Sequence, residues 1–174
     1  MRASTFWKLV TVDEANFLDA LIDLLERHRI RYCVVGGQGV NAYAEPVVSL
    51  DLDLVIAVDQ VAEFEKLAGR LFSIERFPHS LNLSAPGSEL RVQVQTDPRY
   101  AGFPGRASGR EILGRTLPVA PMEDVFQGEL WAAMDPGRRA SKRQKDLADI
   151  ARLLEVQPGL RSRTPREILE RLLE

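Results

Sequence analysis

The sequence predicts an α+β protein with a mixed sheet flanked by helices and a C-terminal helical part. Segments typical of short strands are mixed with helical periodicities as far as about residue 120, and only helical periodicities follow from residue 121. The chain has 174 residues, a length that suits a single domain. We therefore expect residues 1–120 to form an α/β core and residues 121–174 to form a helical part packed on that core.

Apolar residues at helical spacing predict the first helix. A capping box at Thr11 and Glu14 would start this helix by satisfying free backbone N–H groups. Pro46 disfavours a helical conformation at the residue before it, so the helix after the first strand must be short. The elements expected as far as residue 72 are a helix to about His28, a strand at 31–36, a short helix at 38–44, a strand at 49–57 and a helix at 59–72.

The second half of the predicted core alternates short strands with turns. The segment TDPRYAGFPGRASGR, residues 96–110, is rich in proline and glycine and is expected to be a loop. Proline and capping-box patterns then predict three helices. The expected elements are strands near 73–77, 80–84, 89–96 and 115–120, a helix from Pro121 to Met134, a helix from the Ser141–Gln144 capping box to about Glu155, and a last helix capped by Thr164 with Pro165 and Glu167.

The composition limits the classes of function. Hydrophobic residues make up 45% of the chain and the net charge is −2, so no global field points to a nucleic acid or a membrane. No apolar run approaches the roughly 20 residues that span a bilayer, and the first ten residues lack a signal-peptide core. The one cysteine, Cys33, excludes an internal disulfide and is expected to be a packing residue. We expect a cytoplasmic protein with no membrane partner.

Asp51 and Asp53 interrupt an otherwise apolar strand. Side chains alternate along a strand, so both carboxylates point to the same face, roughly 7 Å apart. Two like charges repel each other unless something neutralises them. Mg²⁺ prefers hard oxygen ligands and typically binds one or two carboxylates together with substrate phosphates. The pattern favours a Mg²⁺ or Mn²⁺ site, and a half-exposed edge strand with solvated acids remains the alternative.

Gly36 and Gly37 stand between the predicted strand and the short helix. Glycines at this point let backbone N–H groups approach a phosphate closely, although a simple tight turn is the alternative.

The segment GQGVNA also fits the dinucleotide-binding pattern G-x-G-x-x-A, and Asp59 lies about where a ribose-binding acid would be. The short helix and the short strands that follow disfavour this second interpretation, which also leaves the two aspartates unexplained.

The segment VVGGQGVNAYAEPVVSLDLDLVI resembles the nucleotidyltransferase superfamily, which has the fold of DNA polymerase β. The shared signature is a Gly-Gly turn followed by D-x-D on the next strand. The segment KRQKDLADIARLL is similar to the K-D-x-x-D helix of the AbiEii-like branch, which includes toxins of type IV toxin–antitoxin systems. The resemblance covers about residues 30–156. It implies Mg²⁺-dependent transfer of a nucleotide from an NTP to an acceptor, with tRNA as one acceptor and a cognate antitoxin as a protein partner.

The resemblance also implies roles for the residues of the first motif. Asp51 and Asp53 would hold Mg²⁺ on the nucleotide triphosphate. Gly36 and Gly37 would hold the phosphates. Ser49 would hydrogen-bond either a phosphate oxygen or the backbone of the D-x-D segment.

Four charged residues, Lys142, Lys145, Asp146 and Asp149, share a stripe of the predicted 141–155 helix, nearly opposite its apolar stripe. We expect this stripe to face outwards, across from the D-x-D strand. A solvated face with internal charge pairs is the simpler interpretation of the residues alone. With the resemblance, Lys145 and Asp146 become candidate catalytic residues, and Lys142 and Asp149 candidate nucleotide-binding residues. The run RRASKRQK could attract a triphosphate or an RNA backbone.

The sequence departs from the family pattern at two places. Gln93 and Gln95 stand where a third carboxylate is expected, and an amide can ligate a metal but cannot act as a general base. Glu129 stands near the position of a lysine that commonly contacts phosphate in AbiEii-like proteins. These departures leave a second class of function open, a catalytically lapsed nucleotidyltransferase-fold protein that binds a nucleotide or a partner.

Aromatic residues add little to this prediction. Trp131 lies in an apolar helix and is expected in the core rather than stacked on a base. Arg99 and Tyr100 follow a strand end and are weaker candidates for lining an acceptor site.

Overall fold

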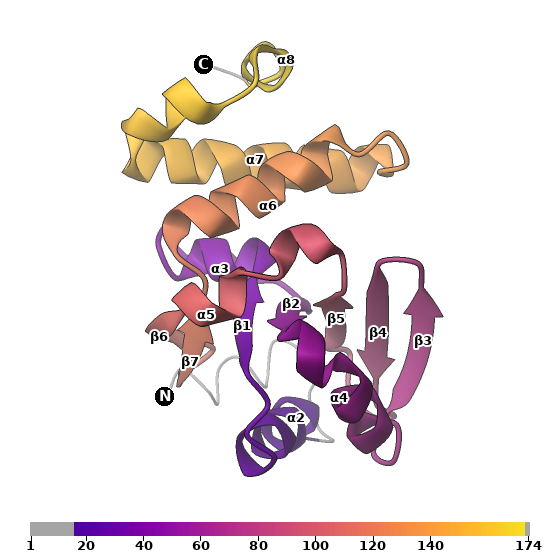
Figure 1. The fold of residues 1–174 in the computed structure, drawn as a ribbon. Helices are drawn as coiled ribbons and strands as arrows, with labels where there is room; N and C mark the ends of the chain where they lie inside the picture. The colour runs from indigo at the N-terminus through magenta and orange to yellow at the C-terminus, as the bar shows by residue number, and fades with distance from the viewer. Residues whose placement is uncertain (1–15, 173–174) are drawn as a thin grey trace.

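A computed structural model describes residues 16–172, which form a seven-stranded mixed sheet with helices on both faces (Figure 1). The strands are β1 (Tyr32–Val35), β2 (Asp51–Ile56), β3 (Ser73–Phe77), β4 (Ser80–Ser84), β5 (Arg91–Gln95), β6 (Ser108–Ile112) and β7 (Arg115–Val119). The helices are α2 (Phe17–Arg27), α3 (Gly36–Asn41), α4 (Val61–Ala68), α5 (Phe103–Arg106), α6 (Met122–Met134), α7 (Ala140–Val156) and α8 (Arg166–Leu169). Three 3₁₀ turns are η1 (Val58–Gln60), η2 (Pro98–Tyr100) and η3 (Pro158–Arg163).

The strand order is β3-β4-β5-β2-β1-β7-β6. The β2–β5 and β1–β7 pairs are parallel, and the other neighbouring strands are antiparallel. Helix α3 therefore joins two antiparallel strands, β1 and β2. A dinucleotide-binding unit needs a helix that crosses between parallel strands, so the interpretation of GQGVNA as such a unit is wrong.

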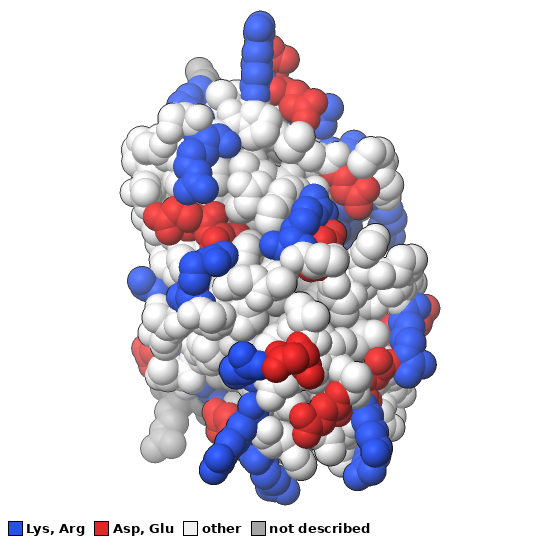
Figure 2. Space-filling view, viewed as in Figure 1, with Lys and Arg blue, Asp and Glu red and all other residues white. Residues whose placement is uncertain are grey.

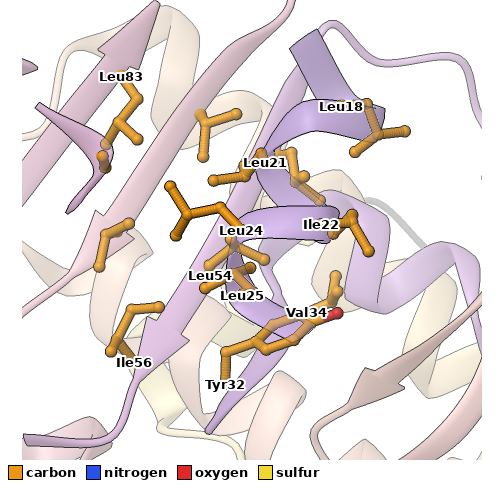
Figure 3. Close-up of a cluster of buried hydrophobic side chains, with 14 of the residues drawn as sticks. Leu18, Leu21, Ile22, Leu24, Leu25, Tyr32, Val34, Leu54, Ile56 and Leu83 are labelled. Atoms are coloured by element: carbon orange, nitrogen blue, oxygen red, sulfur yellow. The ribbon is translucent and has the colours of Figure 1, made fainter. Parts of the chain in front are cut away.

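Side-chain alternation divides the sheet into two buried faces. Leu52, Leu54 and Ile56 point to the face covered by α2 and α4. Figure 3 shows Leu54 beside the leucines of α2. Val55 points to the opposite face, where it belongs to an apolar cluster with residues of α3, α5, α6 and α7. Burial of each leucine or isoleucine stabilises the fold by about 1.5–3 kcal/mol, which fixes the face to which these side chains point. Because side chains alternate along a strand, the two aspartates of β2 must point to the other face. Asp51 and Asp53 consequently face α6 and α7.

The C-terminal helices α6 and α7 pack against each other and against α3. An apolar cluster joins Val35 and Val55 of the sheet to Phe126 of α6 and Ile150 of α7. The division of the chain at residue 120 stays a prediction. Within residues 16–172, no helix combines the length and the apolar character needed to cross a membrane.

The α+β prediction is confirmed. The ends of the strands predicted at 31–36, 49–57, 73–77, 80–84 and 89–96 lie within two residues of the ends of the observed strands β1 to β5. The predicted loop at 96–110 is wrong in detail, because it contains η2, α5 and the start of β6. Strand β6 forms through its antiparallel pairing with β7, a long-range contact that its Gly-containing sequence does not predict. The helix expected to reach residue 72 ends at Ala68, and Leu71 is 61% exposed.

The predicted helix caps at Ser141 and Thr164 are wrong, and a third cannot be compared with the structure. The Thr11–Glu14 box lies outside the described residues. Ser141 lies inside α7, whose N-cap is Arg139. The Thr164 hydroxyl donates to the Leu160 carbonyl at 3.0 Å instead of capping α8. Hydroxyl side chains readily bond back to a carbonyl four residues earlier, and this competes with the capping role.

Candidate active site

A cavity of about 530 Å³ lies between the polar face of the sheet and helices α6 and α7. This volume is within the range of small-molecule sites, about 300–1,000 Å³. Every site residue predicted from the sequence lines this cavity except Ser49, which contacts one of the lining residues. The structure therefore brings together the Gly-Gly turn, the D-x-D strand and the charged stripe of α7.

The Gly-Gly turn closes directly against Asp53. Gly36 has a φ of +64°, and a Cβ at this position would overlap the Asp53 carboxylate. Glycine is required here both by the left-handed backbone and by the close approach. The turn consequently brings backbone and carboxylate together at one end of the cavity.

Asp53 makes no hydrogen bond or ion pair with any residue between 16 and 172. Burial, followed by the negative charge of Asp51, raises the pKa of Asp53 to about 6. Its carboxylate is therefore the less stable of the pair as an anion and has most to gain from a bound cation.

Asp51 differs because three cations surround its carboxylate. Arg91 Nε lies 2.8 Å from one oxygen, and Lys142 Nζ and Lys145 Nζ lie 3.2 and 3.7 Å from the other. Burial would raise the pKa of Asp51, but Lys142, Arg91 and Lys145 together outweigh it and hold the pKa below its usual value. Asp51 is therefore ionised at neutral pH.

The donor set of the cavity fits a divalent cation that arrives with a nucleotide. Asp51 and Asp53 offer hard carboxylate oxygens on one face of a strand. Among the described residues, no group of three or more His, Cys, Asp or Glu side chains is arranged to hold a metal. The remaining ligands would be water and phosphate oxygens, as is usual for Mg²⁺ at nucleotide sites.

Lys145 lies over the Gly-Gly turn. Its amine is 3.4 Å from Ser49 Oγ, and a Cβ on Gly37 would lie 3.5 Å from it. Ser49 Oγ in turn accepts a hydrogen bond of 3.1 Å from the backbone N–H of Asp51. Of the two roles considered for Ser49, the structure contains the hydrogen bond to the D-x-D backbone.

The expectation that the charged stripe of α7 faces outwards is wrong for its two acids. Asp146 and Asp149 are 3% and 5% exposed, because this side of α7 faces the cavity and helix α3. Arg138 forms a two-point ion pair with Asp146 at 2.7 and 2.8 Å, and Arg152 Nη1 lies 2.8 Å from Asp149. The two acids therefore hold arginines in place instead of presenting free carboxylates.

Arg138 is a cavity residue that the sequence did not single out. Its only sequence signal was membership of the basic run RRASKRQK. Together with Lys142 and Lys145, it places three cationic side chains in the lining of the cavity, which suits a triphosphate.

Comparison with known proteins identifies the architecture. No family model and no curated protein sequence matches the chain. The lincomycin-bound crystal structure of the lincosamide antibiotic adenylyltransferase LnuA is similar, with a TM-score of 0.55 and 16% identity over 84% of this chain and 99% of that chain. The chain has the nucleotidyltransferase fold.

Two further structures with the nucleotidyltransferase fold support this assignment. The solution structure of the antibiotic-resistance factor ANT(2'')-Ia has a TM-score of 0.54 and 14% identity over 88% of this chain and 93% of that chain. A putative nucleotidyltransferase from Thermotoga maritima has a TM-score of 0.51 and 17% identity over 67% of this chain and 83% of that chain. Identities this low show the fold alone, and the AbiEii-like assignment stays a prediction.

Gln93 and Glu129, which depart from the nucleotidyltransferase pattern, both line the cavity. Gln93 stands directly opposite Asp53 in the parallel β2–β5 pair, so an amide occupies the place next to the D-x-D carboxylate. Glu129 of α6 is 5% exposed and has no hydrogen-bond or ion-pair partner among residues 16–172. Burial raises the pKa of Glu129 well above its usual value, and the nearby charges of Asp149, Asp146 and Asp53 raise it further.

The aromatic residues near the cavity belong mainly to the core. Trp131 is half-buried and packs against Tyr100 and Phe103, with the Arg99 guanidinium 4.8 Å from its ring centre. Tyr100 also lines the cavity, whereas Arg99 forms an ion pair with Asp97 outside it.

Proposed function

We propose that this protein is a metal-dependent nucleotidyltransferase that transfers a nucleotide from an NTP to an acceptor held in the same cavity. The observation that carries the proposal is the arrangement of Asp51 and Asp53 between the Gly36–Gly37 turn and the amines of Lys142 and Lys145. This arrangement offers oxygen ligands to a cation and positive charges to a triphosphate within one cavity.

In this proposal, different residues of the cavity bind the metal ion and the phosphates. Asp51 and Asp53 would hold a Mg²⁺ or Mn²⁺ ion, which when bound neutralises charge on the phosphates and on the departing pyrophosphate. Lys142 and Lys145 lie beside Asp51 and are positioned to contact the phosphates once Asp51 carries the cation. In the transfer, the acceptor oxygen bonds to the α-phosphorus, the bond from that phosphorus to the bridging oxygen breaks, and pyrophosphate leaves.

The acceptor hydroxyl must also lose a proton. Gln93 cannot take it, because an amide has no basic site of suitable strength. Asp146 and Asp149 are each bound by an arginine. Glu129 lines the cavity without such a partner. Its pKa is raised, so its ionised form is a stronger base than an ordinary carboxylate, and we assign that ionised form the role of proton acceptor.

Two kinds of acceptor fit this reaction. The sequence resemblance suggests tRNA, within a toxin–antitoxin-like role that includes an antitoxin partner. The fold neighbours suggest a small molecule, because LnuA is lincomycin-bound and ANT(2'')-Ia has been solved with adenylyl-2''-tobramycin. Figure 2 shows basic and acidic side chains interspersed over the face in view, a pattern that favours neither RNA nor another polyanion there.

A second candidate function is a catalytically lapsed binding protein with the same fold. Gln93 beside Asp53 is the observation that favours it, because the strand acid that would serve as a base is replaced by an amide. This candidate predicts nucleotide binding without transfer, which separates it from the enzyme.

The test is calorimetric titration with each of the four NTPs, with and without Mg²⁺. We compare the wild type with Asp51→Asn and Asp53→Asn, and use Asp59→Asn as the matched control because Asp59 is an exposed surface residue. Binding that requires Mg²⁺ and both cavity aspartates, followed by transfer of labelled nucleotide, supports the enzyme. Mg²⁺-dependent binding with no transfer supports the lapsed protein, and no binding by a folded wild type contradicts both.

A further inference from the structure

A row of polar side chains crosses the sheet from Asp53 to the edge strand. Asp53 of β2 stands opposite Gln93 of β5, Gln93 opposite Asn82 of β4, and Asn82 opposite Glu75 of β3. All four residues line the cavity. Neighbouring strands lie about 4.8 Å apart, so the row extends about 14 Å from the aspartate. We call Gln93, Asn82 and Glu75 the polar row.

We propose that the polar row binds the acceptor of the reaction, and that this acceptor is a small hydroxylated molecule carrying a cationic amine. The inference rests on the proposed nucleotidyl transfer and deepens it. It assigns the substrate-recognising residues and the chemical class of the second substrate.

The strand order determines on which side of Asp53 the acceptor must lie. Strand β2 has β1 on one side, leading into the Gly36–Gly37 turn, and β5 on the other. The turn and Lys145 are suited to the triphosphate and its departing pyrophosphate. Attacking and leaving oxygens lie on opposite sides of the phosphorus in line, so the acceptor must approach from the β5 side. The polar row begins on that side with Gln93.

The chemistry of the row suits a ligand that carries hydroxyl groups. Asn82 lines the cavity, and its side-chain Nδ2 group can donate a hydrogen bond to such a hydroxyl. The Gln93 amide can both donate and accept, so it suits a hydroxyl group next to the reacting one.

The charge of the row disfavours a nucleic-acid acceptor. Glu75 at the outer end is exposed and forms no ion pair with a residue in the described range 16–172. Arg91 is the cation that β3, β4 and β5 contribute to the cavity lining, and it is bound to Asp51 at 2.8 Å. A phosphate backbone would therefore meet a free carboxylate and no free cation, whereas an ammonium group would meet a partner.

The test uses labelled NTP with four probes: tobramycin, glucosamine, glucose and total tRNA. Tobramycin and glucosamine carry amines as well as hydroxyls, glucose carries hydroxyls alone, and tRNA is a polyanion. We expect label on the amine-bearing probes. Label on tRNA alone, or on no probe while Mg²⁺-dependent NTP binding is intact, would overturn the inference. Loss of that NTP binding would instead contradict the proposed function.

Variants then test the residues. Glu75→Gln is expected to raise KM for the amine-bearing probe about fivefold, and Asn82→Leu about tenfold. Neither variant should change the dissociation constant for Mg²⁺–NTP. Glu63→Gln is the matched control, because Glu63 is exposed on α4 at the opposite face of the sheet. An unchanged KM in the well-folded Glu75→Gln variant would show that the amine does not bind at the polar row.

Discussion

Gly36 approaches the carboxylate of Asp53 so closely that a Cβ at position 36 would overlap it. The backbone of Gly36 is also left-handed, with a φ of +64°. The same residue therefore determines both the shape of the turn and the space left for the second aspartate of the D-x-D strand. A substitution there should damage stability and binding together.

We predict that Gly36→Ala destabilises the protein by about 1–3 kcal/mol and abolishes Mg²⁺-dependent NTP binding. The added methyl group would strain the backbone and displace the Asp53 carboxylate. Urea unfolding and calorimetry measure the two effects. Gly105→Ala is the control, because nothing lies within 4 Å of a Cβ there and its backbone is helical. Retained NTP binding in Gly36→Ala would show that the close approach has no role in the site.

The pKa of Asp53 is expected at about 6, well above that of an ordinary aspartate. A titration followed by carboxyl ¹³C NMR would measure it. Asp51→Asn should lower the pKa of Asp53, because it removes a neighbouring negative charge and leaves Lys142 and Lys145 nearby. Mg²⁺ with a nucleotide should lower it further. An Asp53 that titrates near 4 in the free protein would contradict the environment described for it.

Glu129→Gln should stabilise the protein at neutral and higher pH. The folded state raises the pKa of Glu129, so between the unfolded and the folded pKa the folded chain binds more protons than the unfolded chain. Stability contributed at this position therefore falls as the pH rises through that window. We expect the variant to have a higher Tm than the wild type at pH 8 and the same Tm at pH 4, below the ordinary pKa of glutamate.

The same variant tests the catalytic assignment. If Glu129 accepts the proton of the acceptor, Glu129→Gln should lower kcat about 10²–10⁴-fold while NTP binding persists. Glu123→Gln, in the first turn of the same helix and outside the main cavity, provides the control. A stabilised variant with full activity would assign the proton to another group.

The Arg138–Asp146 ion pair offers a way to separate stability from binding. Arg138→Met leaves the buried Asp146 carboxylate without its partner, and we expect a loss of about 2 kcal/mol, reduced because the Arg138 side chain is 32% exposed. The double variant Arg138→Met/Asp146→Leu should recover most of that stability, since an apolar pair can replace a buried ion pair. NTP binding should remain weakened in both variants. Chemical denaturation and calorimetry measure the two quantities, and full NTP affinity in the double variant would exclude Arg138 from the phosphate site.

The sequence predicted correctly those features that depend on a single short segment of the chain. Alternation along 49–57 placed Asp51 and Asp53 on the same face, and the structure has them on the face opposite Leu52 and Leu54. The short helix before Pro46 was predicted at 38–44; the structure has it at Gly36–Asn41, with Gly36 and Gly37 as its first two residues. These features depend on backbone conformation and on residues two to four positions apart, which the sequence displays directly.

By itself, then, the sequence determined the fold class, the common face of Asp51 and Asp53 and the glycine turn beside them. Only the tertiary structure decided which residues stand around them. Asp51 meets Lys142 across 91 positions of chain, and Asp53 meets Gln93 through the register of β2 with β5. Burial of Asp146 on the cavity side of α7 makes an acid that was expected to face outwards the partner of Arg138. Strand register and helix packing arise from contacts between distant segments, and no periodicity within one segment records which distant residue will face it.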